Sequence, residues 1–367
     1  MTAAVPAWAR PAEAPLSPRD ALTRVVYLMD RSLAPGQKIK AFRRARDVVD
    51  EVERLRGPDE LAAMAAAGKL TDLPGIGAST AAVIAQALAG DVPERVRDLE
   101  ASTAVPLSEA GAPYRAALAG DCHLHSDWSD GGAPIRDMAL AAMGLGHRWM
   151  VLTDHSGRLT VAHGLNAERL TEQLDVIAAL NAELAPFRIL TGMEVDILED
   201  GTLDMTPEML ARLDVVVASV HSKLRMDRTA MTHRMVRAIA DPNVDILGHC
   251  TGRKLSSSGE QPTSDAEPKR PPSDFDAELI FAACAKFDVA VEINCRPERQ
   301  DPPDDLLALA LEWDCKVSID TDAHAPGQLE WQAYGCDKAA AHGIDPNRIV
   351  TTWDADRLLA WTASHNA

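Results

Sequence analysis

Histidine and acidic residues occur in this sequence at spacings that suit metal ligands. His123 and His125 are two residues apart, so on an extended strand both imidazoles point to the same face. Asp322 and His324 repeat that spacing further along the chain. Asp130 lies in a Ser-Asp-Gly-Gly turn, which can carry a carboxylate back over a strand end. These side chains predict a site for divalent cations.

Six of the 11 histidines follow short apolar runs that have the length of buried strands. Together with three carboxylates, the candidate ligands are His123, His125, Asp130, His155, Glu194, His221, His249, Asp322 and His324. One such histidine is usually an ordinary hydrogen-bonded residue, but six of them with three carboxylates reverse that expectation. Nine ligands are too many for one tetrahedral zinc ion and suit two or three cations such as Zn²⁺, Mn²⁺ or Fe²⁺.

The apolar runs alternate with helix-like segments, which is the pattern of a parallel β/α barrel. Seven runs are predicted as strands: 120–123, 149–153, 188–192, 214–220, 244–247, 289–293 and 316–319. Most of them end within a residue or two of His, Asp or Glu. Because the C-terminal strand ends of a parallel barrel meet at one mouth, we expect the candidate ligands to converge there.

The chain before the barrel has a different pattern. An Ala- and Pro-rich segment, 1–18, predicts a mobile tail, and residues 19–98 predict a small all-helical domain. A connector, 99–118, leads to the barrel at 119–367, in which the polar and Pro-rich segment 256–274 predicts a mobile loop.

Within the helical domain, Gly75, Ile76 and Gly77 precede a helical run, as in a helix-hairpin-helix motif that binds DNA. The glycines allow the backbone to approach a phosphate closely, and the first amides of the following helix can donate to it. Lys38, Lys40 and Arg43 add a basic face. The alternatives are a tight turn between helices without a ligand and a basic face that is merely solvated.

The composition, with 46% hydrophobic and 25% charged residues, is that of a globular protein with a core. The net charge of −18 is uneven: residues 1–98 carry +1 and residues 99–367 carry −19. The acidic part predicts either a solvated surface or carboxylates that bound cations neutralise. The absence of an apolar run of about 18 residues or a signal sequence, and six cysteines without a Cys-x-x-Cys pair, predict a cytoplasmic protein with reduced thiols and no membrane partner.

Six short segments of the sequence resemble motifs of one protein family. They are Asp121–Gly131, Thr153–Ser156, Gly192–Leu198, Ser219–Ser222, Gly248–Arg253 and Asp322–His324. They resemble the polymerase and histidinol phosphatase (PHP) family, most of all the PHP domain of bacterial family X DNA polymerases. Residues 20–94 resemble the N-terminal helical domain of the same polymerases, but the polymerase palm and fingers that should lie between the two domains are missing. The resemblance implies an α/β fold, a distorted seven-stranded TIM-like barrel, and excludes polymerase activity of that family.

The resemblance also implies three divalent ions with assigned ligands. The first ion would be held by His123, His125, Glu194 and Asp322, which are also the expected catalytic residues. Glu194 would bridge to a second ion at His221 and His249, and the third would lie at Asp130, His155 and His324. Amidohydrolases also begin with a His-x-His motif, but Glu194 and the final Asp-x-His motif favour the phosphoesterase.

Three functions follow as hypotheses. The first is a metal-dependent hydrolase of phosphate esters that processes DNA 3′ ends or acts as a 3′-5′ exonuclease. The second is a phosphomonoesterase of the histidinol phosphatase type, acting on a small metabolite. The third is a DNA-binding scaffold without activity, against which the complete ligand set argues. Arg253, Arg296 and Arg299 are candidates for phosphate binding, with surface ion pairs as the alternative.

Overall fold

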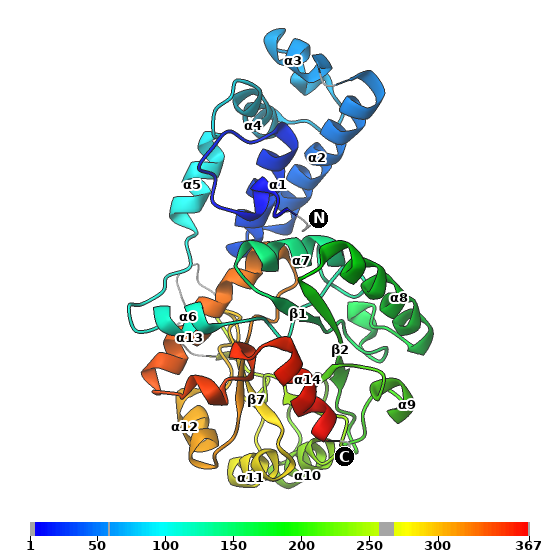
Figure 1. Cartoon of the computed structure of the whole chain (residues 1–367), viewed down its shortest axis with the longest axis vertical. Coiled ribbons are helices and arrows are strands. Elements are labelled where there is room, and N and C mark those ends of the chain that lie inside the picture. The colour runs from blue at the N-terminus through cyan, green and yellow to red at the C-terminus, as the bar shows by residue number, and fades with distance from the viewer. Residues whose placement is uncertain (1–3, 58, 257–267, 366–367) are drawn as a thin grey trace. The chain divides into compact units, whose positions relative to one another are not determined.

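The computed structural model describes residues 4–57, 59–256 and 268–365. The chain divides into two compact units, which are described separately (Figure 1). The helical unit comprises Ala4–Val105 and the short segment Ala325–Glu330. The barrel unit comprises Pro106–His324 and the chain from Trp331 onward.

The helical unit is built around one buried helix, α1 (Pro18–Arg31). Ser17 caps its N-terminus by accepting a hydrogen bond from the amide of Asp20. The other helices are α2 (Gly36–Arg56), α3 (Asp59–Ala66), α4 (Ala78–Leu88) and α5 (Glu94–Ser102). Helices α2, α4 and α5 pack against α1, which buries residues on all sides of its axis. Its buried Arg24 is compensated by Glu100, whose Oε1 lies 2.9 Å from Nε of Arg24.

The segment predicted to be a mobile tail is in part packed onto this unit. Trp8 is only 4% exposed, and its ring centroid lies 6.5 Å from that of Tyr27. The carbonyl of Trp8 accepts from the guanidinium of Arg24, and the amide of Ala12 donates to Glu100. The prediction for this segment is therefore wrong, because one aromatic side chain and two hydrogen bonds outweigh the Ala and Pro composition.

The helical unit also contains Ala325–Glu330, which begins one residue after His324 in the sequence. A Cβ atom on Gly327 would lie 1.9 Å from the carbonyl oxygen of Tyr27, so only glycine permits this approach. Glu330 Oε2 lies 2.7 Å from Nη1 of Arg31. Removal of the helices would therefore also remove the packing partners of Ala325–Glu330.

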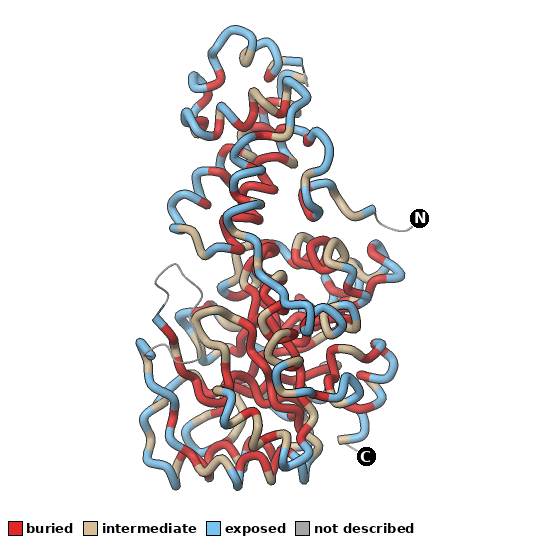
Figure 2. The backbone as a smooth tube through the Cα atoms, turned by 90° about the vertical axis from the view of Figure 1, so that its left-hand side faces the viewer, coloured by how far each residue is buried: buried red, intermediate tan, exposed pale blue. Residues whose placement is uncertain are grey.

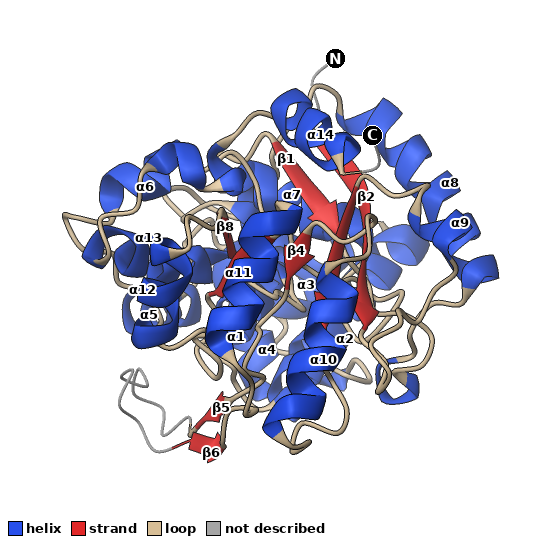
Figure 3. Cartoon of the chain, turned by 90° about the horizontal axis from the view of Figure 1, so that it is seen from below, coloured by secondary structure: helices blue, strands red, loops and turns tan. Residues whose placement is uncertain are grey.

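The barrel unit contains a curled sheet of six parallel strands surrounded by helices (Figure 3). The strand order is β1 (Trp149–Leu152), β2 (Arg188–Asp196), β3 (Val215–Ser219), β4 (Ile246–Leu247), β7 (Ala290–Asn294) and β8 (Val317–Asp320). The helices are α6 (Ala112–Ala117), α7 (Ile135–Gly144), α8 (Ala167–Leu184), α9 (Pro207–Leu210), α10 (Arg228–Ile239), α11 (Ala277–Phe287), α12 (Asp304–Glu312), α13 (Gln332–Ala341) and α14 (Ala355–Ser364). Side-chain oxygens of Asn166, Asp227, Asp276 and Asp354 cap four of them.

Side chains alternate along each strand, and this alternation separates two layers of core. Met193 on β2 and Val291 on β7 face the surrounding helices. Leu190 on β2 and Ala290 on β7 face the barrel interior, where Trp353 and Trp361 also pack. Figure 2 shows this buried backbone as a continuous red region. By the same alternation, Glu194 and Glu292 belong to the interior row.

The first predicted strand, 120–123, does not form a regular ladder. The carbonyl of Asp121 accepts from the amide of Val151, so the segment does lie along β1. However, carboxylates rather than strand carbonyls bind its amides: Asp320 Oδ1 accepts from Cys122, and Asp121 Oδ1 accepts from His123. The other six predicted runs correspond to the six strands of the sheet.

Two further predicted segments differ from expectation. Within the predicted loop 256–274, residues 257–267 lie outside the described part of the chain, whereas Pro268–Arg270 forms β6, which pairs antiparallel with β5 (Lys254–Leu255). The predicted connector contains helix α6, held by a 2.9 Å hydrogen bond from the hydroxyl of Tyr114 to the carbonyl of Ile344. No described helix is long and apolar enough to span a membrane.

We expect Gly120→Ala to destabilise the barrel unit. A Cβ atom at this position would lie 2.3 Å from two atoms of the Trp149 indole, which is itself fully buried. Overpacking of this kind costs about 1–3 kcal/mol. Thermal melting followed by tryptophan fluorescence should show a lower Tm. Gly36→Ala is the control, because a Cβ there meets no atom within 4 Å; equal melting of both variants would contradict the prediction.

Candidate metal centre

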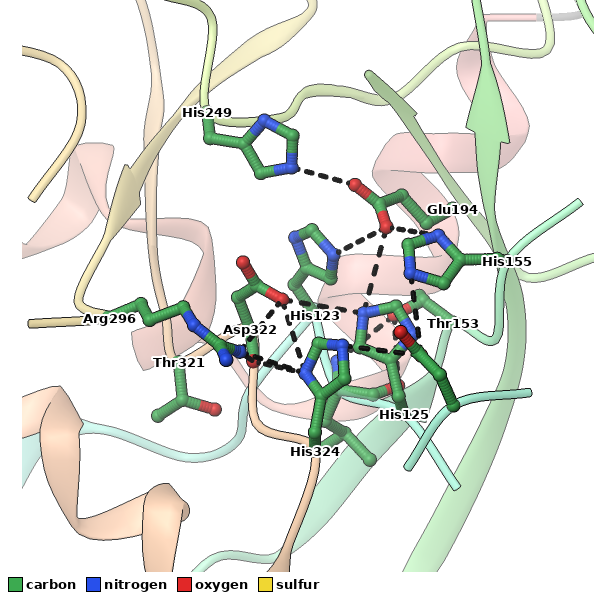
Figure 4. A network of polar contacts seen from close by, with 12 residues as sticks. His123, His125, Thr153, His155, Glu194, His249, Arg296, Thr321, Asp322 and His324 are labelled. Carbon is green, nitrogen blue, oxygen red and sulfur yellow. Dashed lines mark hydrogen bonds and ion pairs between the residues drawn. The ribbon is translucent and has the colours of Figure 1, made fainter. Parts of the chain in front are cut away.

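Glu194 lies at the centre of the candidate site (Figure 4). It is on the interior face of β2 and is only 1% exposed. Oε2 of Glu194 lies 2.8 Å from His155 Nδ1, 3.3 Å from His123 Nε2 and 3.6 Å from His125 Nε2. Oε1 lies 2.8 Å from His249 Nε2 and 3.1 Å from His221 Nε2. One carboxylate thus contacts five imidazoles from four segments of the chain: His123 and His125 lie before β1, and the other three follow β1, β3 and β4.

The remaining candidates lie beside this centre; Asp130 and His324 are more exposed, whereas Asp322 is buried. Oδ1 of Asp130 lies 3.3 Å from His324 Nε2 and 3.6 Å from His155 Nε2. Oδ1 of Asp322 lies 3.5 Å from both His125 Nε2 and His324 Nδ1. The structure therefore brings all nine sequence-predicted ligands together.

Three groups have ligand atoms within 4.8 Å of one another, as one ion would require. They are His123, His125 and Glu194; His155, Glu194 and His221; and His125, Asp130, His155 and His324. The resemblance to the family assigns each histidine to one ion, whereas here His125 and His155 each belong to two groups.

The donor atoms of the site fit metal ions. Buried imidazole nitrogens normally have a hydrogen-bond partner. Both ring nitrogens of His125 and of His221 are buried without one, and so is Nε2 of His123. Oε2 of Glu194 is likewise buried without a hydrogen-bond partner. Nitrogen and carboxylate donors that converge without hydrogen bonds are suited to Zn²⁺, Mn²⁺ or Fe²⁺.

Buried acidic residues support the loops that carry the candidate ligands. Asp154 accepts from the amide and hydroxyl of Ser126, from the hydroxyl of Ser129 and from Nε2 of Gln173. These bonds hold the turn that presents Asp130. Asp196 Oδ1 accepts from the amide of His221 at 3.2 Å, which fixes the backbone after β3.

The buried carboxylate of Glu194 and the surrounding imidazoles shift one another's pKa values. Burial alone would raise the pKa of Glu194. The surrounding imidazoles, of which His221 has the largest effect, instead hold this pKa well below the usual value for a carboxyl. Burial alone would lower the pKa of His221, but the charge of Glu194 raises it to about 9. The pKa of His125 is lowered by burial and by the neighbouring His324.

Two of the three predicted arginines lie beside the candidate ligands. Nε of Arg299 is 3.0 Å from Oδ2 of Asp322, and Nη1 of Arg296 is 3.0 Å from Nδ1 of His324. Arg253 has a different task, because its buried guanidinium donates to the carbonyls of Arg299 and Gln300. Arg253 therefore holds the loop that carries the other two arginines.

The candidate DNA-binding residues lie in the helical unit. Gly75 has a φ of +102°, and Gly77 is the N-cap of α4. Both glycines and the exposed Lys38 line a cavity of about 640 Å³. Arg43 is less available than predicted, since Nη2 lies 3.1 Å from the buried carboxylate of Asp30.

Sequence reasoning missed one residue of the site, Glu292. Its Oε1 is 2.6 Å from Nδ1 of His123, and the residue is fully buried. The sequence does contain a signal for it. Glu292 is a charged residue within the otherwise apolar run 289–293, two residues from the interior Ala290 and therefore on the same face of the strand.

The comparisons with known proteins agree with this geometry. Residues 121–258 match the PHP domain family. Over 207 residues the chain is 41% identical to the DNA polymerase/3′-5′ exonuclease PolX of Bacillus subtilis, a match that covers 56% of this chain and 34% of that protein. It is 27% identical over 220 residues to a probable phosphatase of Thermoanaerobacter, covering 56% of this chain and 78% of that protein. The chain thus spans about a third of the Bacillus relative.

Among solved structures, histidinol phosphate phosphatase from Lactococcus lactis, determined with zinc, L-histidinol and phosphate, matches with a TM-score of 0.42 and 20% identity. This match covers 62% of this chain and 95% of that one. The motifs of the sequence and the family match lead to one conclusion: residues 121–258 are similar to the PHP domain family, and over 207 residues the chain is similar to the DNA polymerase/3′-5′ exonuclease PolX of Bacillus subtilis.

Proposed function

We propose that this protein is a metal-dependent phosphoesterase that acts on DNA, either trimming 3′ ends or as a 3′-5′ exonuclease. The observation that carries the proposal is the convergence of six imidazoles on the buried carboxylate of Glu194 and its neighbours. Five of them have a ring nitrogen that is buried without a hydrogen-bond partner, namely those of His123, His125, His155, His221 and His249. The nine residues named above would hold up to three divalent cations. When bound, such cations activate water and neutralise the charge that develops on a phosphate in the transition state.

The chain's own residues would bind and orient the ester. Arg299 and Arg296 lie next to Asp322 and His324, within reach of a phosphate at the mouth. Burial and the nearby charge of Arg299 lower the pKa of Lys254, and Arg270 adds to that effect. These four residues bring basic side chains together in an otherwise acidic unit, where Asp322 pairs with Arg299 and Glu298 lies 3.2 Å from Arg296. Such a cluster favours a substrate with more than one phosphate, as in a nucleic acid strand.

The helical unit offers a second phosphate contact. The first amides of α4 follow Gly77 and point out of the helix N-terminus, where anions are bound favourably. Lys38 lies in the same cavity. Contacts of this kind read the DNA backbone rather than base edges, so binding without sequence preference is expected.

A small phosphate monoester is the second candidate substrate. The charge of −19 on residues 99–367 favours it, since DNA is repelled by an acidic surface. The name of the Thermoanaerobacter relative, a probable phosphatase, agrees with this alternative. Parallel assays of the metal-loaded protein on single-stranded DNA, 3′-phosphorylated DNA and histidinol phosphate separate the two: turnover of histidinol phosphate alone would favour the monoesterase.

Metal affinity should rise with pH. The pKa of about 9 for His221 means that its imidazole is protonated at neutral pH when no ion is bound. A cation must displace that proton, so affinity should increase about tenfold per pH unit for each proton released and weaken as pH falls. Titration calorimetry with ZnCl₂ at pH 6, 7 and 8, in buffers of different ionisation enthalpy, measures both effects. An affinity independent of pH would contradict this assignment.

Glu194→Gln should abolish hydrolysis and reduce the number of bound ions. The amide cannot serve as a charged bridge between two cations, so their mutual repulsion is no longer screened. The metal-free variant should still fold, because the substitution removes a buried charge rather than a packed side chain. Elemental analysis and turnover are compared with Glu312→Gln, an exposed glutamate on α12. Retention of more than about a tenth of wild-type turnover would argue against the bridging role.

Lys38→Glu should weaken DNA binding without changing hydrolysis of a small chromogenic phosphate ester. Loss of one phosphate contact should reduce the slope of log affinity against log salt by about 1. Lys286→Glu, an exposed lysine on α11, makes the same charge change in the barrel unit and is the control. If both variants bind DNA alike, the helical unit is not the DNA contact.

A further inference from the structure

One buried carboxylate contacts two of the candidate ligands from the side opposite to Glu194. Glu292 lies on the interior row of β7 and has no exposed surface. Its Oε1 is 2.6 Å from Nδ1 of His123. Its Oε2 accepts from the backbone amide of His249 at 2.5 Å and from Nδ2 of Asn294 at 3.3 Å. Both oxygens of this buried group are therefore used.

The contact with His123 fixes which ring nitrogen carries hydrogen. A carboxylate can only accept, so Nδ1 of His123 must be its donor. Nε2 is then the nitrogen left to face Glu194, whose Oε2 is 3.3 Å away. This nitrogen is buried and has no hydrogen bond of its own. Glu292 thus selects the tautomer and the ring orientation that a metal ligand requires.

The contact with His249 fixes a backbone rather than a ring. β4 is only two residues long, so its end is held by few ladder bonds. The amide of His249 is instead held by Glu292, and Nε2 of the same residue then reaches Oε1 of Glu194 at 2.8 Å. The two histidines therefore contact different oxygens of Glu194.

We propose that Glu292 is a positioning residue that orients two candidate metal ligands at once, through the ring of His123 and the backbone of His249. The inference rests on the proposed metal centre. The hydrogen-bonded carboxylates found behind metal-binding histidines typically change metal affinity by 10–100-fold when they are removed. Glu292 should have at least that effect, because it supports two ligands. No other described carboxylate lies as close to the outer nitrogen of a candidate ligand: Asp196 is 3.5 Å from Nδ1 of His221.

The barrel offers a matched control in Asp245. Its Oδ1 lies 2.8 Å from Nδ1 of His365, and its Oδ2 accepts from the amide of Val216 at 2.8 Å. Asp245 is also buried, at 4% exposure, but it immediately precedes β4, whereas the candidate ligands follow the strands. A carboxylate that binds one imidazole and one amide is therefore present at a place with no candidate ligand.

The experiment compares Glu292→Ala, Glu292→Gln and Asp245→Asn in the full-length chain. Each protein is loaded with ZnCl₂ and dialysed against a graded series of chelator concentrations, and bound zinc is measured by elemental analysis. Melting of the metal-free proteins reports the structural cost. Co²⁺ loading adds an absorption spectrum that depends on ligand geometry.

We expect Glu292→Ala to weaken zinc affinity at least tenfold, to lose zinc at lower chelator concentrations than the wild type, and to alter the Co²⁺ spectrum. Glu292→Gln keeps the shape but has only one acceptor oxygen, so it should lie between Glu292→Ala and wild type, and it remains informative if the alanine variant does not fold. Asp245→Asn should lower the Tm and leave zinc binding unchanged. Unchanged zinc affinity and spectrum in both Glu292 variants would overturn the inference, whereas a wild-type protein that binds no zinc, manganese or iron would overturn the proposed function instead.

Discussion

The burial of the Glu194 carboxylate among five imidazoles is the constraint on which the site depends. An ionised carboxylate taken out of water costs several kcal/mol unless charges or hydrogen bonds compensate it. The compensation here cannot come from one neighbour in sequence, because the imidazoles follow four different segments of chain. Only strands that run parallel can bring those segments to one edge. The buried charge of Glu194 therefore depends on the architecture of the barrel unit.

The groups behind the imidazoles show how the charge is distributed. Glu292 on one side and Asp196 on another face ring nitrogens that point away from Glu194. Arg299 neutralises Asp322, whose pKa is well below its usual value because of that contact, against the opposing effect of burial. Negative and positive groups thus lie next to one another in the site, and a bound cation would displace the proton of His221, whose pKa the charge of Glu194 raises to about 9.

The sequence was sufficient to locate a side chain wherever a local pattern, such as the spacing along a strand, determines its position. His123 and His125 share a strand-like spacing, and Glu194 and His249 lie at or beyond strand ends, so topology alone brings them together. It did not find the supporting role of Glu292, because that role depends on a contact between side chains 169 residues apart. The strand predicted at 120–123 is not regular. The carboxylates of Asp320 and Asp121 accept hydrogen bonds from the amides of Cys122 and His123, which a neighbouring strand would otherwise bind.

The same limit applies to the charged residues whose partners lie far away in sequence. The side chain of Arg253 is of a type that binds phosphate, yet its guanidinium donates to the carbonyls of Arg299 and Gln300 in the loop after β7. Trp8 lies in a segment with the composition of a mobile tail, yet its ring and carbonyl contact α1. A sequence pattern gives the type of a side chain and its local periodicity. It does not give the partner that determines whether the group is available to a ligand.

Burial differs across the site, and this difference indicates the direction from which a phosphate arrives. The side chain of Glu194 is 1% exposed, that of His324 is 19% exposed and that of Asp130 is 37% exposed. The opening to solvent therefore lies on the side of Asp130 and His324. Arg296, which contacts His324, stands on that same side. An incoming phosphate meets a cationic side chain and the more exposed ligands first, and the water-excluded carboxylate of Glu194 lies behind them, where electrostatic interactions are strongest.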